Sequence, residues 1–417
     1  MRKGWWINFI LLLVLIIAGG GLWWADKKES AQQELEKAQK AISSIKADQV
    51  TQIHYQGEDG TQIELNRQQD GFHLTTPLES LADPAAVNNL LGILEKSFER
   101  QVSGDHLEAT HFGLDKPEAI LTVTTKENQT LTIVQGSLAP TKRHHYLRLG
   151  EQGPILLVEE THLSGLKQTL NQLRDKRLLP ELEGQLPQRL TLHRKEGTLK
   201  LEKRSNEQWW MEQPVADRAA DNRVQVWINA LTLANGSGFQ TAQPPENPDW
   251  TLTLTPNKGE EITLTIWRQG KDILATRGKN SEALLLFGYL VQDLDKKSLE
   301  LIELHPLKEA QAQITQLTLE QNGQQQTAVA KEGKWPLPAW ETLAETLRQE
   351  AETGDLTAPQ TPASFTLVAK TSQGEFTFPF WKNNQNYLLA PPERAVRLQL
   401  TELQSKVVTD AIQVIFP

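Results

Sequence analysis

The sequence predicts an α+β protein in which a single N-terminal transmembrane helix is followed by three tandem, mainly antiparallel β-sheet modules with helices on one face. Three observations lead to this prediction. An uncharged run of 20 residues lies near the N-terminus, a block of turn, aromatic residue and proline occurs three times, and an amphipathic helix pattern follows each block. A chain of 417 residues has room for two or three domains.

Composition excludes several classes of function. The chain holds 43 Lys+Arg against 52 Asp+Glu, a net charge of −9. Residues 1–47 hold 7 basic and 4 acidic residues, so the rest holds 36 against 48, a net charge of −12. Nucleic-acid binding depends on a basic face, and an acidic body therefore argues against a nucleic-acid partner. Because the chain has no cysteine, thiol catalysis, Cys-ligated zinc, iron–sulfur clusters and disulfides are excluded.

The N-terminal run predicts a membrane anchor over residues 1–25. A helix of 20 uncharged residues is about 30 Å long, which matches the hydrocarbon core of a bilayer. Arg2 and Lys3 precede the run, so the positive-inside rule places the N-terminus in the cytoplasm and the body outside it. Paired tryptophans at both ends are typical of interfacial aromatic belts: Trp5 and Trp6, Trp23 and Trp24. We therefore expect a single-pass protein of the cytoplasmic (inner) membrane with a periplasmic or otherwise extracytoplasmic body.

A cleaved signal peptide is the alternative for this segment. Its apolar region would be Ile7–Ile17, with small residues at Ala18, Gly19 and Gly20. The second tryptophan pair lies beyond that site and favours an uncleaved anchor. Residues 26–47 contain neither Gly nor Pro and are rich in good helix formers, which predicts a helical stalk.

Three copies of one module are predicted to follow, over residues 48–180, 184–305 and 310–417. Hairpin-type turns occur at Asp59-Gly60, Glu196-Gly197 and Asn322-Gly323, between alternating apolar residues. An aromatic residue stands 12 positions after each of these glycines: Phe72, Trp209 and Trp335. This equal spacing indicates an internal repeat.

The sequence of each copy also predicts an amphipathic helix, followed by a pair of strands that a proline precedes. Asp83 and Asp221 stand where helix N-caps belong, and Pro84 suits a first helical position. The apolar stripes follow the spacing i, i+3, i+4, i+7 of a buried helix face: Val87, Leu90, Leu91, Leu94; Val224, Trp227, Ile228, Leu231; Trp340, Leu343, Ala344, Leu347. With two more strands and a closing Leu-rich helix, each copy reads β-β-α-β-β-β-β-α.

One string resembles a known family. Residues 112–117 (FGLDKP), together with the earlier block GFHLTTPLESLADPAAVNNLLGIL, resemble the bacterial domain of unknown function 4340 family. Residues 1–180 carry the resemblance, whereas the later copies lack the Gly-Leu-Asp element. Members of this family are often encoded beside ABC transporter permeases of the gliding-motility type. The resemblance therefore implies an extracytoplasmic accessory role in such a complex, and it implies no catalytic residues.

The sequence gives little support for a catalytic or metal-binding site. His144 and His145 are neighbours on a predicted strand and would point to opposite faces, so they would not share a metal. Asp105, Glu108 and Asp115 lie in one loop, where carboxylates commonly accept backbone hydrogen bonds. We expect no catalytic residue, no cofactor and no metal site.

Tryptophan is unevenly distributed. Of the 12 tryptophans, four lie in the predicted anchor, none in residues 25–208 and eight in the later copies. Packing in the core accounts for most of these. A partner or glycan contact is the alternative for four of them: Trp209, Trp210, Trp267 and Trp381.

These observations predict a non-enzymatic, membrane-anchored accessory or scaffold protein outside the cytoplasm, associated with an ABC transporter permease or other envelope proteins. Two alternatives stay open. One is an envelope protein that binds a glycan, lipid or peptidoglycan fragment through its Trp-rich copies. The other is an envelope hydrolase with an unrecognised site.

Overall fold

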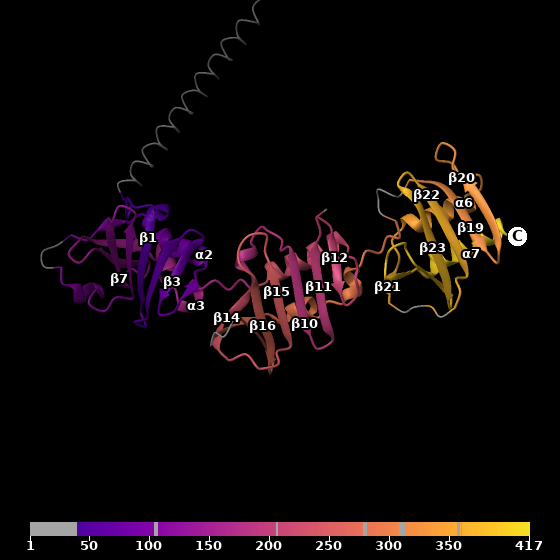
Figure 1. Cartoon of the computed structure of the whole chain (residues 1–417). Coiled ribbons are helices and arrows are strands. Elements are labelled where there is room, and N and C mark those ends of the chain that lie inside the picture. Colours follow the sequence, from indigo (N-terminus) through magenta and orange to yellow (C-terminus); the bar gives the residue numbers. More distant parts are fainter. Residues whose placement is uncertain are drawn as a thin grey trace, which may run out of the picture. The chain divides into compact units, whose positions relative to one another are not determined.

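The structure, a computed structural model, describes residues 40–417 apart from 104–106, 206, 278–281, 308–312, 357–358 and 360. The chain divides into two compact units, the first ending at Asp175 and the second running from Lys176 to Pro417. One large antiparallel sheet lies in the first unit and two lie in the second (Figure 1).

The predicted α+β class is wrong, because the fold is predominantly β, with 43% strand and 22% helix among the described residues. Part of the difference lies in the closing segment of the first copy, whereas the third copy does end in an α-helix, Glu402–Ile415. A 3-10 helix, Glu160–Leu166, and the four-residue α3 (Leu170–Leu173) stand where the first copy was expected to have a Leu-rich helix. A Cβ on Gly165 would lie 2.0 Å from the backbone oxygen of Asn89, so this segment packs closer to its neighbour than a side chain permits.

The predicted transmembrane helix and most of the predicted stalk lie outside the described residues. Trp5, Trp6, Trp23, Trp24, Arg2 and Lys3 all fall there. None of the described helices is both long enough and apolar enough to cross a membrane. The end of the predicted stalk is not helical: residues 40–46 are irregular and lead into a 3-10 helix, Ala47–Gln49. The reason is that Ile42 and Ile45 are buried in the core of the first unit.

The first sheet has nine strands. They are β1 (Val50–Gly57), β2 (Gln62–Gln68), β3 (Gly71–Thr76), β4 (Ser80–Leu81), β5 (Arg100–Gln101), β6 (Ala119–Thr125), β7 (Thr130–Leu138), β8 (His144–Leu149) and β9 (Ile155–Glu159). Their order is β4-β3-β2-β1-β6-β7-β8-β9-β5. Helix α2 (Pro84–Leu91) packs its apolar stripe into the same core. As the sequence predicts, Asp83 caps α2 by accepting a 2.9 Å hydrogen bond from the Ala86 N–H.

The second sheet repeats this topology with nine strands. They are β10 (Arg189–Arg194), β11 (Gly197–Lys203), β12 (Trp209–Gln213), β13 (Asp217–Arg218), β14 (Gly236–Thr241), β15 (Trp250–Thr255), β16 (Ile262–Gln269), β17 (Asp272–Arg277) and β18 (Glu282–Leu286). Their order is β13-β12-β11-β10-β15-β16-β17-β18-β14. Helix α4 (Asp221–Thr232) buries the predicted stripe. Asp221 is not its N-cap: it is the first helical residue, and its Oδ1 accepts a 2.7 Å hydrogen bond from the Trp209 N–H.

The third sheet is shorter, with seven strands. They are β19 (Ile314–Gln321), β20 (Gln324–Val329), β21 (Thr353–Asp355), β22 (Phe365–Thr371), β23 (Gly374–Asn383), β24 (Asn386–Leu389) and β25 (Arg397–Gln399). Their order is β20-β19-β22-β23-β24-β25-β21. Helices α6 (Pro338–Arg348) and α7 (Glu402–Ile415) pack against each other and contribute to the core (Figure 1).

The remaining helical elements are short. They are α5 (Val291–Leu294) and the 3-10 helices Gly92–Glu95, Ala109–Phe112, Pro180–Leu182, Gly288–Leu290 and Ser298–Leu301.

Candidate functional site

Two of the four tryptophans predicted to contact a partner or glycan are core residues. Trp209 on β12 is 2% exposed and packs in the main core of the second unit. Trp267 on β16 is 4% exposed and lies in a small separate cluster with Ala242, Leu274 and Ala283. Neither indole is accessible to a ligand in this structure.

The other two tryptophans, Trp210 and Trp381, are partly exposed and lie on different sheets. The guanidinium of Arg204 stands over the Trp210 ring, 3.6 Å from its centroid, a cation–π contact. Trp381 Nε1 donates a 2.9 Å hydrogen bond to the Thr361 carbonyl. Each indole already has a polar partner within its own unit, and adjacent residues Trp209 and Trp210 face opposite sides of β12, so no continuous aromatic platform forms.

The family-like string of residues 112–117 has a structural role in the first unit. Gly113 ends the 3-10 helix Ala109–Phe112 in the left-handed conformation, with φ +67°, which favours glycine. Leu114 is 4% exposed and packs with Val134 and Ile155, on β7 and β9. The Phe112 ring meets the Tyr146 ring edge-on at 4.8 Å. This loop therefore covers a small apolar cluster of the first sheet.

A glycine on β7 makes this covering possible. A Cβ on Gly136 would lie 2.2 Å from the Phe112 carbonyl oxygen and 3.0 Å from the Leu114 side chain. Ala119 pairs with Gln135 in the first sheet, and Trp250 pairs with Ile266 in the second. Gly136 and Trp267 each come one residue later, so they occupy equivalent positions in the two sheets. The loop of the first unit therefore fills the space that an indole fills in the second sheet.

His144 and His145 have different surroundings, as expected for neighbours on one strand. His144 Nε2 lies 2.7 Å from the Glu99 carboxylate, whereas His145 is buried and its Nδ1 lies 3.2 Å from the Gly136 carbonyl. Glu108 and Asp115 are exposed, and Asp105 falls outside the described residues. Within the described ranges, no group of three His, Asp or Glu side chains could hold a metal ion.

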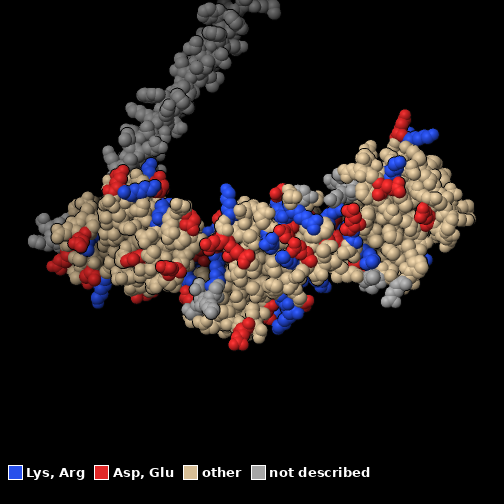
Figure 2. All heavy atoms as spheres, viewed as in Figure 1, with Lys and Arg blue, Asp and Glu red and all other residues tan. Residues whose placement is uncertain are grey.

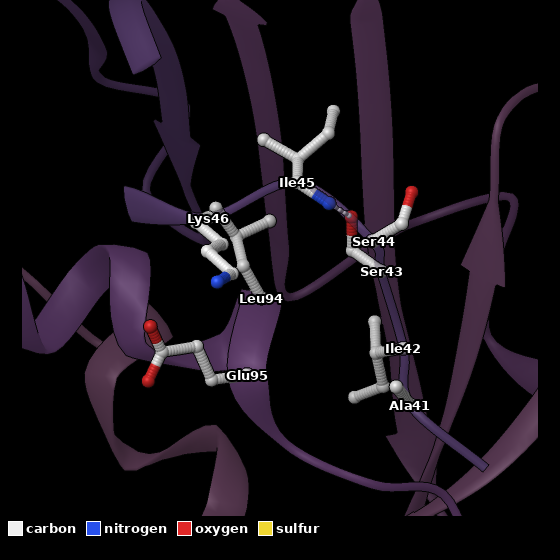
Figure 3. A pocket seen from close by; sticks show the side chains of 8 residues that line it. All are labelled: Ala41, Ile42, Ser43, Ser44, Ile45, Lys46, Leu94 and Glu95. Atoms are coloured by element: carbon white, nitrogen blue, oxygen red, sulfur yellow. Dashed lines mark hydrogen bonds between the residues drawn. The ribbon is translucent and has the colours of Figure 1, made fainter. Parts of the chain in front are cut away.

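A hollow of about 510 Å³ lies where the chain enters the first unit (Figure 3). Residues 41–46 line it together with Leu94 and Glu95. This leading segment is fastened by backbone hydrogen bonds on both sides: the Ile42 N–H donates to the Lys96 carbonyl at 2.9 Å, and the Phe98 N–H donates to the Lys40 carbonyl at 3.0 Å. The segment behaves as part of the first unit rather than as a free linker.

A second hollow, of about 410 Å³, lies beside α4 in the second unit. It combines an exposed apolar side chain, Val226 at 69% exposure, with surrounding polar groups. Trp227 Nε1 donates a 2.8 Å hydrogen bond to the Asp293 carbonyl, and burial raises the pKa of the Asp293 carboxyl. We call this hollow the α4 groove; its full lining is Asn222, Arg223, Val226, Trp227, Ala230, Asp293, Lys296 and Glu300. The lining therefore combines exposed aliphatic surface with charged groups of both signs.

A buried ion pair joins the second and third sheets within the second unit. Asp217 on β13 is 0% exposed on its side chain, and Arg394, in the loop between β24 and β25, is 2% exposed. Asp217 accepts hydrogen bonds from Arg394 Nε at 2.7 Å and from the Val396 N–H at 2.6 Å. Arg394 Nη2 donates to the Glu303 carbonyl at 2.6 Å. Sequence reasoning missed this pair, because its members are 177 positions apart and no local pattern marks either one.

Charges of both signs are interspersed on the surface. Lys and Arg lie among Asp and Glu on the face drawn in Figure 2, and no large area of one sign stands out there.

Residues 72–253 match the model of the family described as Domain of unknown function (DUF4340). This match confirms the predicted family, and the chain carries a domain of it. The extent differs from the predicted residues 1–180, because residues 1–71 lie outside the match and residues 181–253 lie inside it. The match begins in β3 and ends in β15, so it extends from the first sheet into the second. No curated protein matches the chain.

Proposed function

We propose that this DUF4340 protein is a non-enzymatic accessory or scaffold protein, held in the cytoplasmic membrane by its N-terminal segment, with its sheets outside the cytoplasm. Its partner would be an ABC transporter permease or another envelope protein. The uncharged run from Trp5 to Trp24 supports the membrane location, and the family resemblance supports the transporter partner.

The fastened leading segment is the observation that carries the proposal. Ile42 is 3% exposed, and backbone hydrogen bonds hold residues 40–42 to residues 96–98. A membrane segment that ends close to residue 25 would therefore be tied to a packed sheet through fewer than about 20 residues, each spanning at most about 3.5 Å. Such a tether limits how far the first unit can move from the bilayer, as a scaffold requires.

The α4 groove is the contact surface that this proposal assigns to a partner. Val226 exposes an apolar side chain among charged groups of both signs. An exposed apolar side chain can contribute affinity by packing against a partner, and the charged groups around it can favour a partner of complementary charge.

Cysteine labelling tests the membrane topology. Because the chain has no cysteine, Glu58→Cys in an exposed turn and Lys3→Cys before the apolar run each introduce a single thiol. A maleimide that cannot cross the cytoplasmic membrane should label Glu58→Cys in intact spheroplasts and Lys3→Cys only after lysis. Labelling of Glu58→Cys only after lysis would overturn the proposed location.

Site-specific photocrosslinking tests the partner. A photoreactive residue at Val226 in the full chain, in its native membrane, should yield an adduct with a transporter permease or another envelope protein. The same residue at Lys271, an exposed turn position between β16 and β17, is the matched control. Recovery of uncrosslinked chain alone from Val226, under conditions where the probe is active, would contradict the scaffold proposal.

Ligand binding is a second candidate, supported by the partial exposure of Trp210 and Trp381. It predicts that glycan fragments quench tryptophan fluorescence and that Trp210→Ala and Trp381→Ala together abolish the quenching. Unchanged fluorescence with peptidoglycan fragments would count against it.

A further inference from the structure

One edge of the third sheet is a strand whose equivalents in the other two sheets are not edge strands. In the first two sheets, the strand after the first turn is covered by a further strand: β2 by β3, and β11 by β12. The corresponding strand of the third sheet, β20, pairs only with β19 among the described residues. The segment that follows β20 makes a single isolated bridge, between Lys331 and Lys334.

The side chains of β20 explain why its own chain does not cover it. Gln326 and Ala328 pair with Leu319 and Leu317, so they share the core face of the sheet. The equivalent positions on β11 are two fully buried leucines, Leu199 and Leu201. A short or polar side chain at these positions leaves little apolar surface for another core strand to bury.

The outer edge of β20 lacks the features that normally prevent strand pairing. Proteins protect sheet edges with very short strands, charges, prolines or bulges. The edge strands β4, β5 and β13 have two residues each, and β21 has three. The six-residue β14 carries a register irregularity at Gly236. By contrast, β20 has six residues, an unbroken register with β19, no charge and no proline.

The pairing register shows which backbone groups face outward. In an antiparallel pair, successive residues direct their N–H and C=O groups alternately toward the partner strand and away from it. The Ala330 N–H donates to the Thr315 carbonyl, so the even-numbered residues face β19. The N–H and C=O groups of Gln325, Thr327 and Val329 therefore point away from the sheet.

We propose that β20 pairs antiparallel with β20 of a second copy of this chain, with the two-fold axis at Thr327. In this register Thr327 lies opposite Thr327, and Gln325 of each copy lies opposite Val329 of the other. All six outward groups of each strand then have partners. No like charges oppose each other, because Gln324–Val329 carries no charge.

Two observations identify the occupant as a second copy rather than an apolar peptide. Strands β3 and β12 bring a large aromatic residue to the core, Phe72 and Trp209. The third sheet already receives Trp335 from its own chain, partly buried against the core. A strand added at this edge therefore has to supply backbone hydrogen bonds but little apolar surface. The polar strand β20 itself meets this requirement.

Single-cysteine cross-linking of the full chain in membranes tests the register. Opposed Cα atoms of a hydrogen-bonded antiparallel pair are about 5.5 Å apart, within the roughly 4.4–6.8 Å range of a disulfide. Thr327→Cys should form a disulfide-linked dimer on mild oxidation. Gln325→Cys alone and Val329→Cys alone should not, because identical residues would then be offset by about 13 Å along the strands. A mixture of the last two variants should cross-link.

Charge reversal supplies the second test. Thr327→Lys and Thr327→Glu should each shift the full-length protein in detergent from dimer to monomer in sedimentation velocity, because like charges lie at the axis. Mixing these two variants should restore the dimer, while unchanged thermal unfolding shows that both fold. A wild-type chain that stays monomeric, equal cross-linking by Gln325→Cys and Thr327→Cys, or a different protein cross-linked at Thr327 would each overturn the proposal.

Discussion

Replacement of Arg394 by Met should destabilise the second unit strongly. The side chains of Asp217 and Arg394 are 0% and 2% exposed, so neither charge reaches water. Met keeps most of the volume of the Arg394 stem but removes the guanidinium. Asp217 would keep its hydrogen bonds from the Val396 and Arg218 backbone N–H groups, both 2.6 Å long, and lose the cation that donates a hydrogen bond to it.

The expected loss is large because a fully buried carboxylate loses the guanidinium that is hydrogen-bonded to it. Removing one partner of a buried ion pair costs about 3–5 kcal/mol in free energy of unfolding. The matched control is Arg189→Met, which breaks an exposed pair with Glu202 whose side chains are 44% and 34% exposed. That change should cost less than about 1 kcal/mol.

Urea unfolding followed by tryptophan fluorescence is a suitable assay. Eight of the 12 tryptophans lie between Trp209 and Trp381, and the other four lie in residues 5–24. The first sheet has no tryptophan, so a fluorescence change on unfolding of the sheets reports the second unit. The transition of Arg394→Met should move to lower urea. The double variant Arg394→Met with Asp217→Asn should lose less than the sum of the two single changes, because it no longer leaves a charge buried alone. A loss for Arg394→Met no larger than for Arg189→Met would refute this reasoning.

Three further changes are predicted. Gly136→Ala places a Cβ 2.2 Å from a backbone oxygen and should lower the free energy of unfolding of the first unit by about 1–3 kcal/mol, measured by hydrogen exchange. The control Gly92→Ala, with open space around the added Cβ, should be nearly neutral. Trp267→Ala should cost about 3–5 kcal/mol in urea unfolding as a buried aromatic; a cost near zero would show that the indole is not core. Burial opposes ionisation of Glu303, but hydrogen bonds from the His305 backbone and ring hold the pKa of that carboxyl below its usual 4.5. This stabilisation is present above pH 4.5 and is lost as the pH falls through the lowered value, so Glu303→Gln should flatten the acid limb of stability against pH.

The local patterns were sufficient to predict the strand pairs and the main helices. The turns at Gly60, Gly197 and Gly323 each join the first two strands of a sheet, and the predicted stripes of α2, α4 and α6 are buried. These features depend on neighbours within about ten positions, where spacing along the chain reflects spacing in space. The predicted closing helix of the third copy is present as α7, whereas the closing segment of the first copy is mostly a 3-10 helix. Leucines at i and i+3 fit a 3-10 turn as well as an α-helix, so their spacing does not distinguish the two.

The sequence by itself determined the charge balance, the absence of cysteine, the uncharged N-terminal run and the repeated order of strands and helices. Only the tertiary structure decided which tryptophans are buried, that Asp217 meets Arg394, that the loop at Phe112 fills the space over Gly136, and that β20 keeps an uncovered edge. Each of these depends on contacts between residues far apart in the chain. Such contacts are set by how sheets, helices and loops pack together, and periodicity along the chain carries no information about them.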